Sequence, residues 1–560
     1  MRTNRVDTSR SVLSWVQLGM MTVIACGISG SAGLGQSLPA GRQTEVKRGA
    51  PILVGLGPAV ELTLRDAIDR ALTDNLEIRV ERDELQVGDL RIQETRGAYD
   101  PQVGFSVGRD SSATPTTSVL QAGDIASERA SSQTFAPTLS QLLPTGGSIT
   151  ANFSNARAST NNAFLFVNPL YSSGLTIGFE QPLLRGLFNN PVRRELRVRN
   201  LDSHITETQF RQTVSEIVQR VEEQYWSLVY ATEAHRVRQE SRELAVKQRD
   251  QINQKVQAGL LTPVALTAAN AEVAVRDQDV LQAEVLIVAA QNGLKRLLAG
   301  DPTAPIWSGR LAPLDRPQIG DPPATLTEAL QQALDRRPEL ERLDLQAQQQ
   351  QVDREYVAWE TKPQVNVSGN FGSIGRSGQV FRPVFDREGG LSPIGREPDP
   401  SHPAFGAYRE AWNQVFDYSF PHWTVRLDVQ MPIFNRTAHA QLAQVDVTRR
   451  QLQSQVKSQQ QAIMVEVANA YETVMLQRRV LDVARVAREL SQEQVTGEMA
   501  RFEVGFTTNF EVLRYQRDLG EAQVRELRAI IDYQIALAAL RKATGVNLDE
   551  HDLVLAKSPR

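Results

Sequence analysis

Two stretches far apart in the chain decide its fold: residues 63–72 read TLRDAIDRAL, and residues 325–334 read TLTEALQQAL. Each opens on a threonine that is followed three residues later by a carboxylate, a pattern that caps the start of a helix. Residues 63–106 align on 325–368 without a gap, and eleven of the 44 aligned residues are identical. The chain therefore contains an internal duplication, and we expect its architecture to repeat.

A second correspondence lies further along the chain, at a shift of 246 instead of 262 residues. It pairs Val221 with Val467, Tyr225 with Tyr471, and Gly259 with Gly505. The changed shift indicates that the loops between the two matches differ in length. Each copy is expected to run from an opening helix, ending near Gly97 or Glu360, through strands to a long helical hairpin.

Four stretches alternate between apolar and polar residues, which is typical of strands with one apolar face. Their apolar residues are Val103, Phe105 and Val107; Leu175, Ile177 and Phe179; Val365 and Val367; and Val425, Leu427, Val429 and Met431. Pro182 and Pro432 end the second and fourth stretches. One more strand is indicated over 147–155, but the number of strands in the Ser/Thr/Asn-rich segment 109–172 stays open.

Each strand-ending proline is followed by a long helical pattern, over about 193–257 and 438–501. Apolar residues recur every three or four positions among Gln, Glu and Arg, which favours coiled-coil packing over a globular core. At ~1.5 Å per residue, 65 residues give a helix of roughly 100 Å. Gly259 and Gly505 are expected to end these helices, and return helices follow to about Ala299 and Thr544.

Composition excludes several classes of protein. The 61 basic and 65 acidic residues argue against nucleic acid as a partner. One cysteine excludes a disulfide framework, and the six scattered histidines show no metal-ligand spacing. Mean hydropathy is −0.32 and no long apolar run follows residue 30, which excludes a helical membrane protein but leaves a membrane β-barrel open. No enzyme, cofactor or metal site is expected.

The N-terminus has the parts of an export signal, expected over residues 1–35. Arg2, Arg5 and Arg10 precede an apolar stretch and a run of small residues. Two cleavage sites stay open: one before Cys26, as in a lipoprotein that is acylated there, and one near residue 35 that removes Cys26. The remaining divisions are a linker over 36–61, repeat 1 over 62–299, a Pro-rich linker over 300–324, repeat 2 over 325–545, and a tail over 546–560.

The predicted strands and hairpins need neighbouring copies of the chain. Four strands cannot close a barrel, and each unpaired backbone amide costs several kcal/mol in lipid. Two long hairpins that are polar except for narrow seams also bury too little surface alone. We expect a ring of identical subunits that combines a helical tube with a shared strand barrel.

The duplicated Thr-Leu-x-x-Ala opening, the corners at Pro182 and Pro432, and the sequence Phe-Glu-Val-Gly at 502–505 resemble the TolC-like outer-membrane efflux family over about 60–547. The resemblance implies a homotrimer in the outer membrane, a mainly α protein whose four strands per chain make one twelve-stranded barrel. The hairpins would form an α-helical tunnel across the periplasm, with 300–324 and the tail as a belt. Members work with a periplasmic adaptor and an inner-membrane efflux or ABC pump, and perform no chemistry.

The resemblance also implies roles for the two hairpin turns. Adaptor docking would fall on Gly259, Leu260, Leu261, Thr262, Gly505, Phe506, Thr507 and Thr508. The tunnel gate would involve Phe502, Glu511 and Arg514. A threefold ring of Glu511 would favour cations, but Arg514 stands where the family often has a second acid. The pair is either a lock on the closed tip or an ordinary exposed i,i+3 ion pair.

Two questions stay open at this point. The alternative function is a periplasmic structural or adaptor protein with helical hairpins and no pore, although an adaptor should have one hairpin inside a small β-domain. The aromatic segment 372–422 is a packed surface loop, an interfacial belt, or a lid over a pore.

Overall fold

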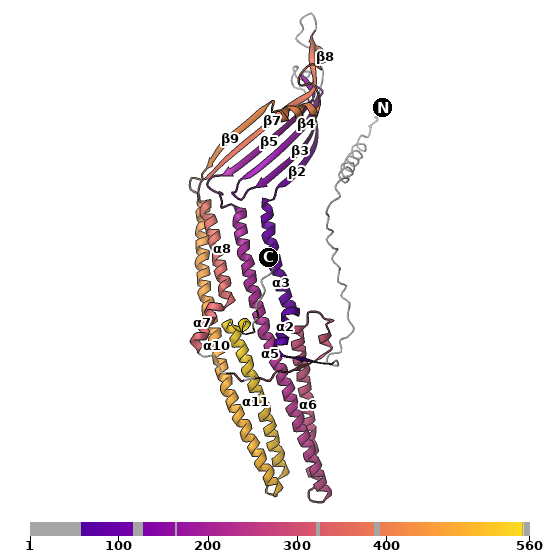
Figure 1. Cartoon of the computed structure of the whole chain (residues 1–560), viewed down its shortest axis with the longest axis vertical. Coiled ribbons are helices and arrows are strands. Elements are labelled where there is room, and N and C mark those ends of the chain that lie inside the picture. Colours follow the sequence, from indigo (N-terminus) through magenta and orange to yellow (C-terminus); the bar gives the residue numbers. More distant parts are fainter. Residues whose placement is uncertain are drawn as a thin grey trace, which may run out of the picture. The chain divides into compact units, whose positions relative to one another are not determined.

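The computed structural model describes residues 58–115, 127–162, 165–317, 319–320, 325–385, 393–551 and 553. The export signal expected over 1–35, with Cys26 in it, lies outside these residues, as do most of the linker 36–61 and the end of the tail. Within the unit formed by residues 53–560, a sheet lies at one end of long helices and two hairpin turns at the other (Figure 1).

Each repeat opens on two helices instead of the single one expected. Repeat 1 has α2 (Leu64–Asp74) and α3 (Leu76–Arg96), and repeat 2 has α7 (Leu326–Arg336) and α8 (Pro338–Glu360). The threonine caps are as predicted, since the side chains of Thr63 and Thr325 accept hydrogen bonds from the backbone three residues on. In repeat 1 the break is at Asn75, whose side chain caps α3. In repeat 2 it precedes a proline, which cannot donate within a helix.

Six strands, not four, form one antiparallel sheet in the order β2-β3-β4-β5-β7-β9. The strands are β2 (Gln102–Pro115), β3 (Ser127–Leu142), β4 (Ser148–Thr160), β5 (Val167–Pro182), β7 (Gln364–Phe385) and β9 (Pro421–Gln430), with β8 (Pro393–Pro398) paired to the outer end of β7. The count of four is too low. The further strand indicated over 147–155 is confirmed as β4, whereas β3 was missed because it is rich in Ser, Thr and Gln on both faces and shows no alternation. The expected twelve strands per trimer rested on that number.

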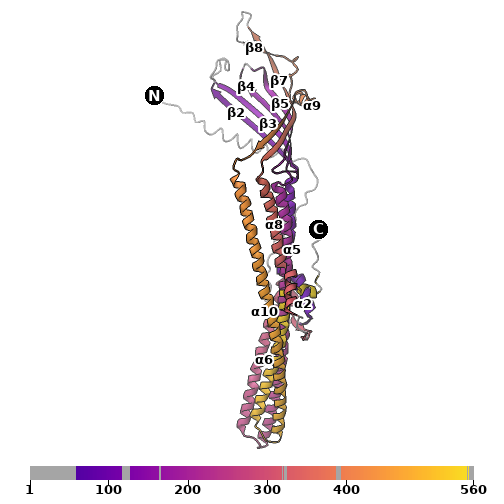
Figure 2. The ribbon, with the colours of Figure 1, turned by 90° about the vertical axis from the view of Figure 1, so that its left-hand side faces the viewer.

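The two longest helices begin and end within two residues of their predicted bounds, and the return helices end within one residue of theirs. Repeat 1 has α5 (Pro191–Gln257) and α6 (Pro263–Leu298), and repeat 2 has α10 (Arg436–Glu503) and α11 (Asn509–Thr544). Each pair forms a hairpin, and α11 also packs on α5 (Figure 2). The predicted seam of α5 is buried in the largest core cluster, where Val214, Ile217 and Val221 have no exposed surface. No helix within the described ranges combines the length and the apolar content needed to cross a membrane.

The Pro-rich linker is partly regular, in contrast to the irregular segment expected. A short strand β6 (Arg310–Pro313) pairs in parallel with β1 (Ala59–Leu62). The hydroxyl of the buried Tyr225 donates to Asp315 Oδ2 at 2.8 Å and is 3.1 Å from the carbonyl oxygen of Leu62. A strand of four residues is too short to produce a detectable alternation, so the sequence did not reveal it.

Candidate functional site

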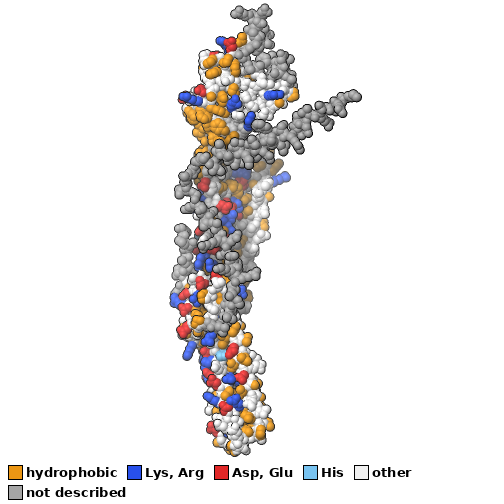
Figure 3. Space-filling view, turned by 90° about the vertical axis from the view of Figure 1, so that its right-hand side faces the viewer, with side chains coloured by type: hydrophobic (Ala, Val, Ile, Leu, Met, Phe, Trp, Pro, Cys, Tyr) orange, Lys and Arg blue, Asp and Glu red, His pale blue; other side chains and the backbone are white. Residues whose placement is uncertain are grey.

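The two faces of the sheet have opposite character. Cross-strand pairing places the apolar residues of neighbouring strands on one face, while Ser, Thr, Asn, Gln and Gly dominate the other. Exposed residues of the apolar face are Val103, Phe105, Val107, Leu139, Ile149, Ile177, Phe179, Phe371, Trp423, Val425, Leu427 and Val429. Figure 3 shows hydrophobic side chains grouped over the sheet, whereas charged ones are spread along the helices. An apolar surface of this extent indicates contact with an apolar medium or a partner.

A short helix, α9 (Tyr408–Phe416), covers one end of this apolar face. Trp412 Nε1 donates to Asn155 Oδ1 at 2.7 Å, and its ring lies 6.0 Å from that of Phe153. At Gly375 a side chain would collide with the carbonyl oxygen of Ala411, so glycine permits the close approach of α9. The aromatic segment therefore packs on the apolar face, which does not fit a lid over the polar face.

Both outer edges of the sheet are unpaired among the residues that the structure describes. Among the described strands, β2 bonds only to β3, and β9 bonds only to β7. Nearly every residue of β9 is exposed, on both faces of the strand. Because an open strand edge is a template for pairing with another chain, both edges are available to a partner.

The helices repeat this arrangement of lateral edges. Near the sheet the packing order is α3-α5-α8-α10, and toward the turns it is α6-α5-α11-α10. Helix α10 is thus at one lateral edge throughout, on the same side as β9, while α3 and α6 are at the other edge with β2. Exposed apolar residues follow both edges at helical spacing: Leu476, Val480, Val483 and Leu490 on α10, and Leu281, Val285 and Val288 on α6.

The two hairpin turns are built alike. Gly259 and Gly505 have φ angles of 72° and 80°, a region that glycine adopts without strain. In each turn the following residue donates its amide to a carbonyl of the last helical turn, from Leu260 to Lys255 at 2.8 Å and from Phe506 to Arg501 at 2.9 Å. Phe506 is 85% exposed and Leu260 is 73% exposed, so both turns present an apolar side chain to the outside.

Contacts between the hairpins hold the two turns together. Lys255 Nζ lies 4.5 Å from the centre of the Phe502 ring, and the Gln248 side-chain amide donates to Asn509 Oδ1. Sequence reasoning singled out Phe502 but missed Lys255, Gln248 and Asn509. These residues have no motif, and their pairing exists only because the two hairpins pack side by side.

Glu511 and Arg514 form the ion pair that their spacing allows. Arg514 Nη2 is 2.7 Å from Glu511 Oε2 within one chain. The pKa of Arg514 is raised, first by a hydrogen bond with Tyr515 and then by the charge of Glu511. Glu511 is therefore half of an ion pair within the chain and not a free carboxylate.

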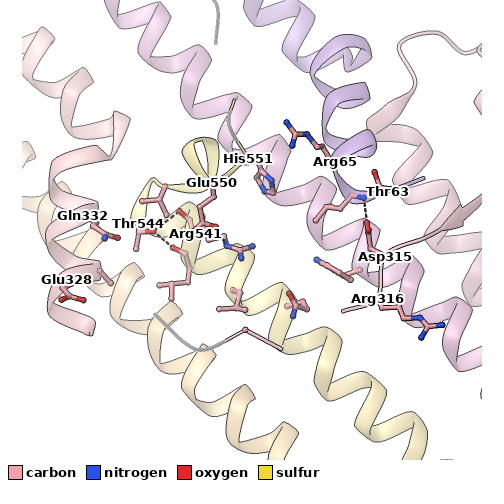
Figure 4. A pocket seen from close by; sticks show the side chains of 18 of the residues that line it. Thr63, Arg65, Asp315, Arg316, Glu328, Gln332, Arg541, Thr544, Glu550 and His551 are labelled. Atoms are coloured by element: carbon pink, nitrogen blue, oxygen red, sulfur yellow. Dashed lines mark hydrogen bonds and ion pairs between the residues drawn. The ribbon is translucent and has the colours of Figure 1, made fainter. Parts of the chain in front are cut away.

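A cavity of about 800 Å³ lies where the repeats meet, between α2, α7 and α11. Figure 4 shows Glu328 and Gln332 on one side of it and Asp315 and Arg316 on the other. Its charges are mixed, and no group of three or more metal-binding side chains occurs in the described part of the chain. Behind it the buried Glu222 contacts His551 and lies 3.8 Å from Arg541, which attaches the start of the tail to α5.

A buried ion cluster joins the opening of repeat 2 to its hairpin. The side chain of Arg337 is 4% exposed and bonds to Glu339 at 2.9 Å and to Glu466 at 2.8 Å, while Lys542 reaches Glu466 at 2.9 Å. Burial raises the pKa of Glu466, but hydrogen bonds from Arg337 and Lys542 outweigh it, so the pKa is lowered overall. The cluster holds the helix break of repeat 2 on α10 and α11.

Two comparisons relate parts of the sequence to known proteins. Residues 329–546 match the family model described as outer membrane efflux protein. The alkaline protease secretion protein AprF of Pseudomonas aeruginosa is 26% identical over 137 residues, 24% of this chain. The matched part spans 28% of the length of that relative.

Solved structures share the fold over most of the described chain. The channel-forming protein CusC matches with a TM-score of 0.60 and 15% identity, over 93% of this chain and 100% of that one. The outer-membrane channel MtrE of Neisseria gonorrhoeae matches with a TM-score of 0.56 and 16% identity, over 86% and 89%. The outer-membrane channel CmeC of Campylobacter jejuni matches with a TM-score of 0.57 and 14% identity, over 87% of this chain and 89% of that one.

Proposed function

Because the chain belongs to the TolC-like outer membrane efflux protein family, we propose that it is the outer-membrane exit channel of an efflux or type I secretion system. The observation that carries the proposal is one sheet with an exposed apolar face and two unpaired edges, set on long polar helical hairpins. The apolar face suits lipid, and the polar face suits a water-filled lumen. The chain acts as a passive conduit and performs no chemistry of its own.

Copies of the chain supply the missing edge partners. At each level one lateral edge belongs to repeat 2 (β9 or α10) and the other to repeat 1 (β2, α3 or α6). A head-to-tail ring pairs β9 with β2 of the next copy and α10 with its α3 and α6. Such a heterologous contact closes into a ring when the rotation per copy divides a full turn. We take three copies, the homotrimer that the family resemblance implies.

The two turns are the docking site for a periplasmic adaptor. The two turns lie at the end of the helices opposite the sheet (Figure 1), and each has an exposed apolar residue, Leu260 or Phe506. The duplication gives the two turns nearly the same form. A ring of three copies therefore presents six exposed apolar side chains, three of Leu260 and three of Phe506, to the hairpins of an adaptor. An inner-membrane efflux or ABC pump completes the pathway.

The gate lies beside the second turn, with Phe502 just before it on α10 and Glu511 and Arg514 just after it on α11. Phe502 packs on Lys255, and Glu511 pairs with Arg514, so the residues that narrow the tip are held within each copy. In this arrangement the ring of Glu511 is largely neutralised. Cation preference would depend on how far Arg514 moves away when the tip opens.

Planar-bilayer conductance of the detergent-extracted oligomer tests the channel. We expect discrete conductance steps. Arg514→Gln should shift the selectivity toward cations because it frees the Glu511 carboxylate, and Glu511→Gln should shift it toward anions because it frees the Arg514 guanidinium. The spacer alternative predicts no conductance from either variant and no oligomer with heat-modifiable migration. That pair of results would contradict the proposed function.

A further inference from the structure

The number of strands per copy sets the width of the barrel, and here it is six. Every residue of β2 pairs with β3, and β4 pairs with β5 along most of its length, so the extra hairpin β3–β4 is part of the wall. Leu139 and Ile149 of this hairpin are exposed on the same apolar face as Val103 and Phe179. The hairpin therefore continues the lipid-facing surface without interruption.

We propose that three copies of this chain close an eighteen-stranded barrel, half again as wide as a barrel of four strands per copy. The proposal rests on the proposed function, since it takes the ring of three copies from it. The six strands alternate in direction, so β9 of one copy runs antiparallel to β2 of the next. An even number of strands per copy is the condition for such closure, and six satisfies it as four does.

The dimensions of the helical tube support the wider barrel. Four helices per copy at each level give a ring of twelve helices in the trimer. With about 9 Å between neighbouring helix axes, this ring has a circumference of about 110 Å. Eighteen strands about 4.8 Å apart, tilted by about 40°, also span about 110 Å. Twelve strands would span only about 75 Å. An eighteen-stranded barrel can thus continue the helical tube without a taper.

The β3–β4 hairpin is placed so that it could be deleted without changing the direction of any other strand. β2 ends and β5 begins at the same end of the sheet, so a direct connection between them restores four strands and keeps all directions. In repeat 2 the corresponding segment between β7 and β9 instead forms β8 and α9. The two repeats therefore differ in what they insert at one and the same place.

Engineered disulfides test the junction between copies. In a Cys26→Ser background, Val103→Cys combined with Leu427→Cys, Val429→Cys or Met431→Cys should give covalent trimers, because these residues share a face near the helical end of β2 and β9. The matched control is Val103→Cys with Trp423→Cys, at the opposite end of β9, which should stay monomeric. Absence of cross-linking in the whole panel would overturn both the barrel and the ring on which the proposed function depends.

Electron cryomicroscopy of the trimer in lipid nanodiscs then counts the strands. Eighteen strands with β3 and β4 in the wall is the expected result. A cross-linked ring with twelve strands, and with the β3–β4 hairpin folded away from the wall, would overturn the barrel width and leave the channel function standing. In a variant lacking residues 116–164 the cross-section of the barrel lumen should fall about two-fold, since the diameter grows with strand number.

Discussion

At single positions, the clearest requirement is the positive φ at the two turns. Gly505→Ala is expected to strain its turn by about 1 kcal/mol, because alanine adopts a positive φ angle unfavourably. An added Cβ would meet no atom within 4 Å, so a steric clash contributes nothing. Hydrogen exchange of the amides around residues 504–508 should quicken, while the melting temperature of the oligomer stays nearly constant.

Gly497 provides the matched control for this change. It lies inside α10 with nothing within 4 Å of an added Cβ and with an ordinary helical backbone. Gly497→Ala should therefore stabilise the helix slightly, by about 0.5–1 kcal/mol. Faster exchange at the turn in this variant as well would contradict the assignment of the effect to the φ angle.

Arg337 is the residue whose loss should cost the most stability. Arg337→Ala leaves Glu339 buried without its partner, and breaking a buried ion pair from one side costs about 3–5 kcal/mol. Its neighbour Arg336 makes only an exposed pair with Asp549, at 2.6 Å. Arg336→Ala should cost at most about 1 kcal/mol. Thermal melts of the helical circular dichroism signal compare the two, and equal losses would refute the special role of Arg337.

The same cluster predicts a dependence of stability on pH. The pKa of Glu466 is lower in the folded chain than in the unfolded one. Its contribution is therefore complete above the ordinary glutamate pKa, about 4.5, and is lost as the pH falls through the folded value. Melting temperatures between pH 3 and pH 7 should fall less steeply for Glu466→Gln than for the unchanged chain. Glu472→Gln, at an exposed position of the same helix, should leave the slope unchanged.

At the scale of elements, the contact between the two hairpins governs the tip. Lys255 on α5 and Phe502 on α10 form a cation–π pair, worth about 0.5–1 kcal/mol at an exposed site. Lys255→Ala should therefore favour opening by about two- to five-fold for each copy of the chain, which planar bilayers would record as a higher open probability. Lys247→Ala, at an exposed position two turns earlier on α5, should not. A Lys255→Ala effect that persists in full in a Phe502→Ala background would exclude the pair as its cause.

For the whole molecule, the opposite faces of the sheet decide insertion into the membrane. Val107 is 69% exposed on the apolar face, and its neighbour Ser106 points to the polar face. An arginine on the lipid face of a barrel costs about 2–4 kcal/mol near the middle of the bilayer. Val107→Arg should therefore reduce the inserted fraction in a vesicle flotation assay, whereas Ser106→Arg should insert like the unchanged chain. Equal insertion of both would contradict the assignment of the faces.

Local patterns were enough to predict much of this molecule. Several features depend on residues that are close in sequence and were therefore predictable from it. They are the threonine caps, the alternating strands, the apolar seams of the long helices and the glycine turns. The duplication then doubled the number of positions at which each pattern could be recognised. Both bounds of α5 and α10 and the ends of α6 and α11 were predicted to within two residues.

Other features arise between segments that are far apart in the chain. β3 became a strand because β2 and β4 satisfy its backbone on both sides, although its own residues show no alternation. Lys255 acquired a role because Phe502 lies across from it, and Arg337 because Glu466 packs over the helix break. Backbone pairing and desolvation of charge depend on neighbours in space, and a linear sequence contains no local signal of either.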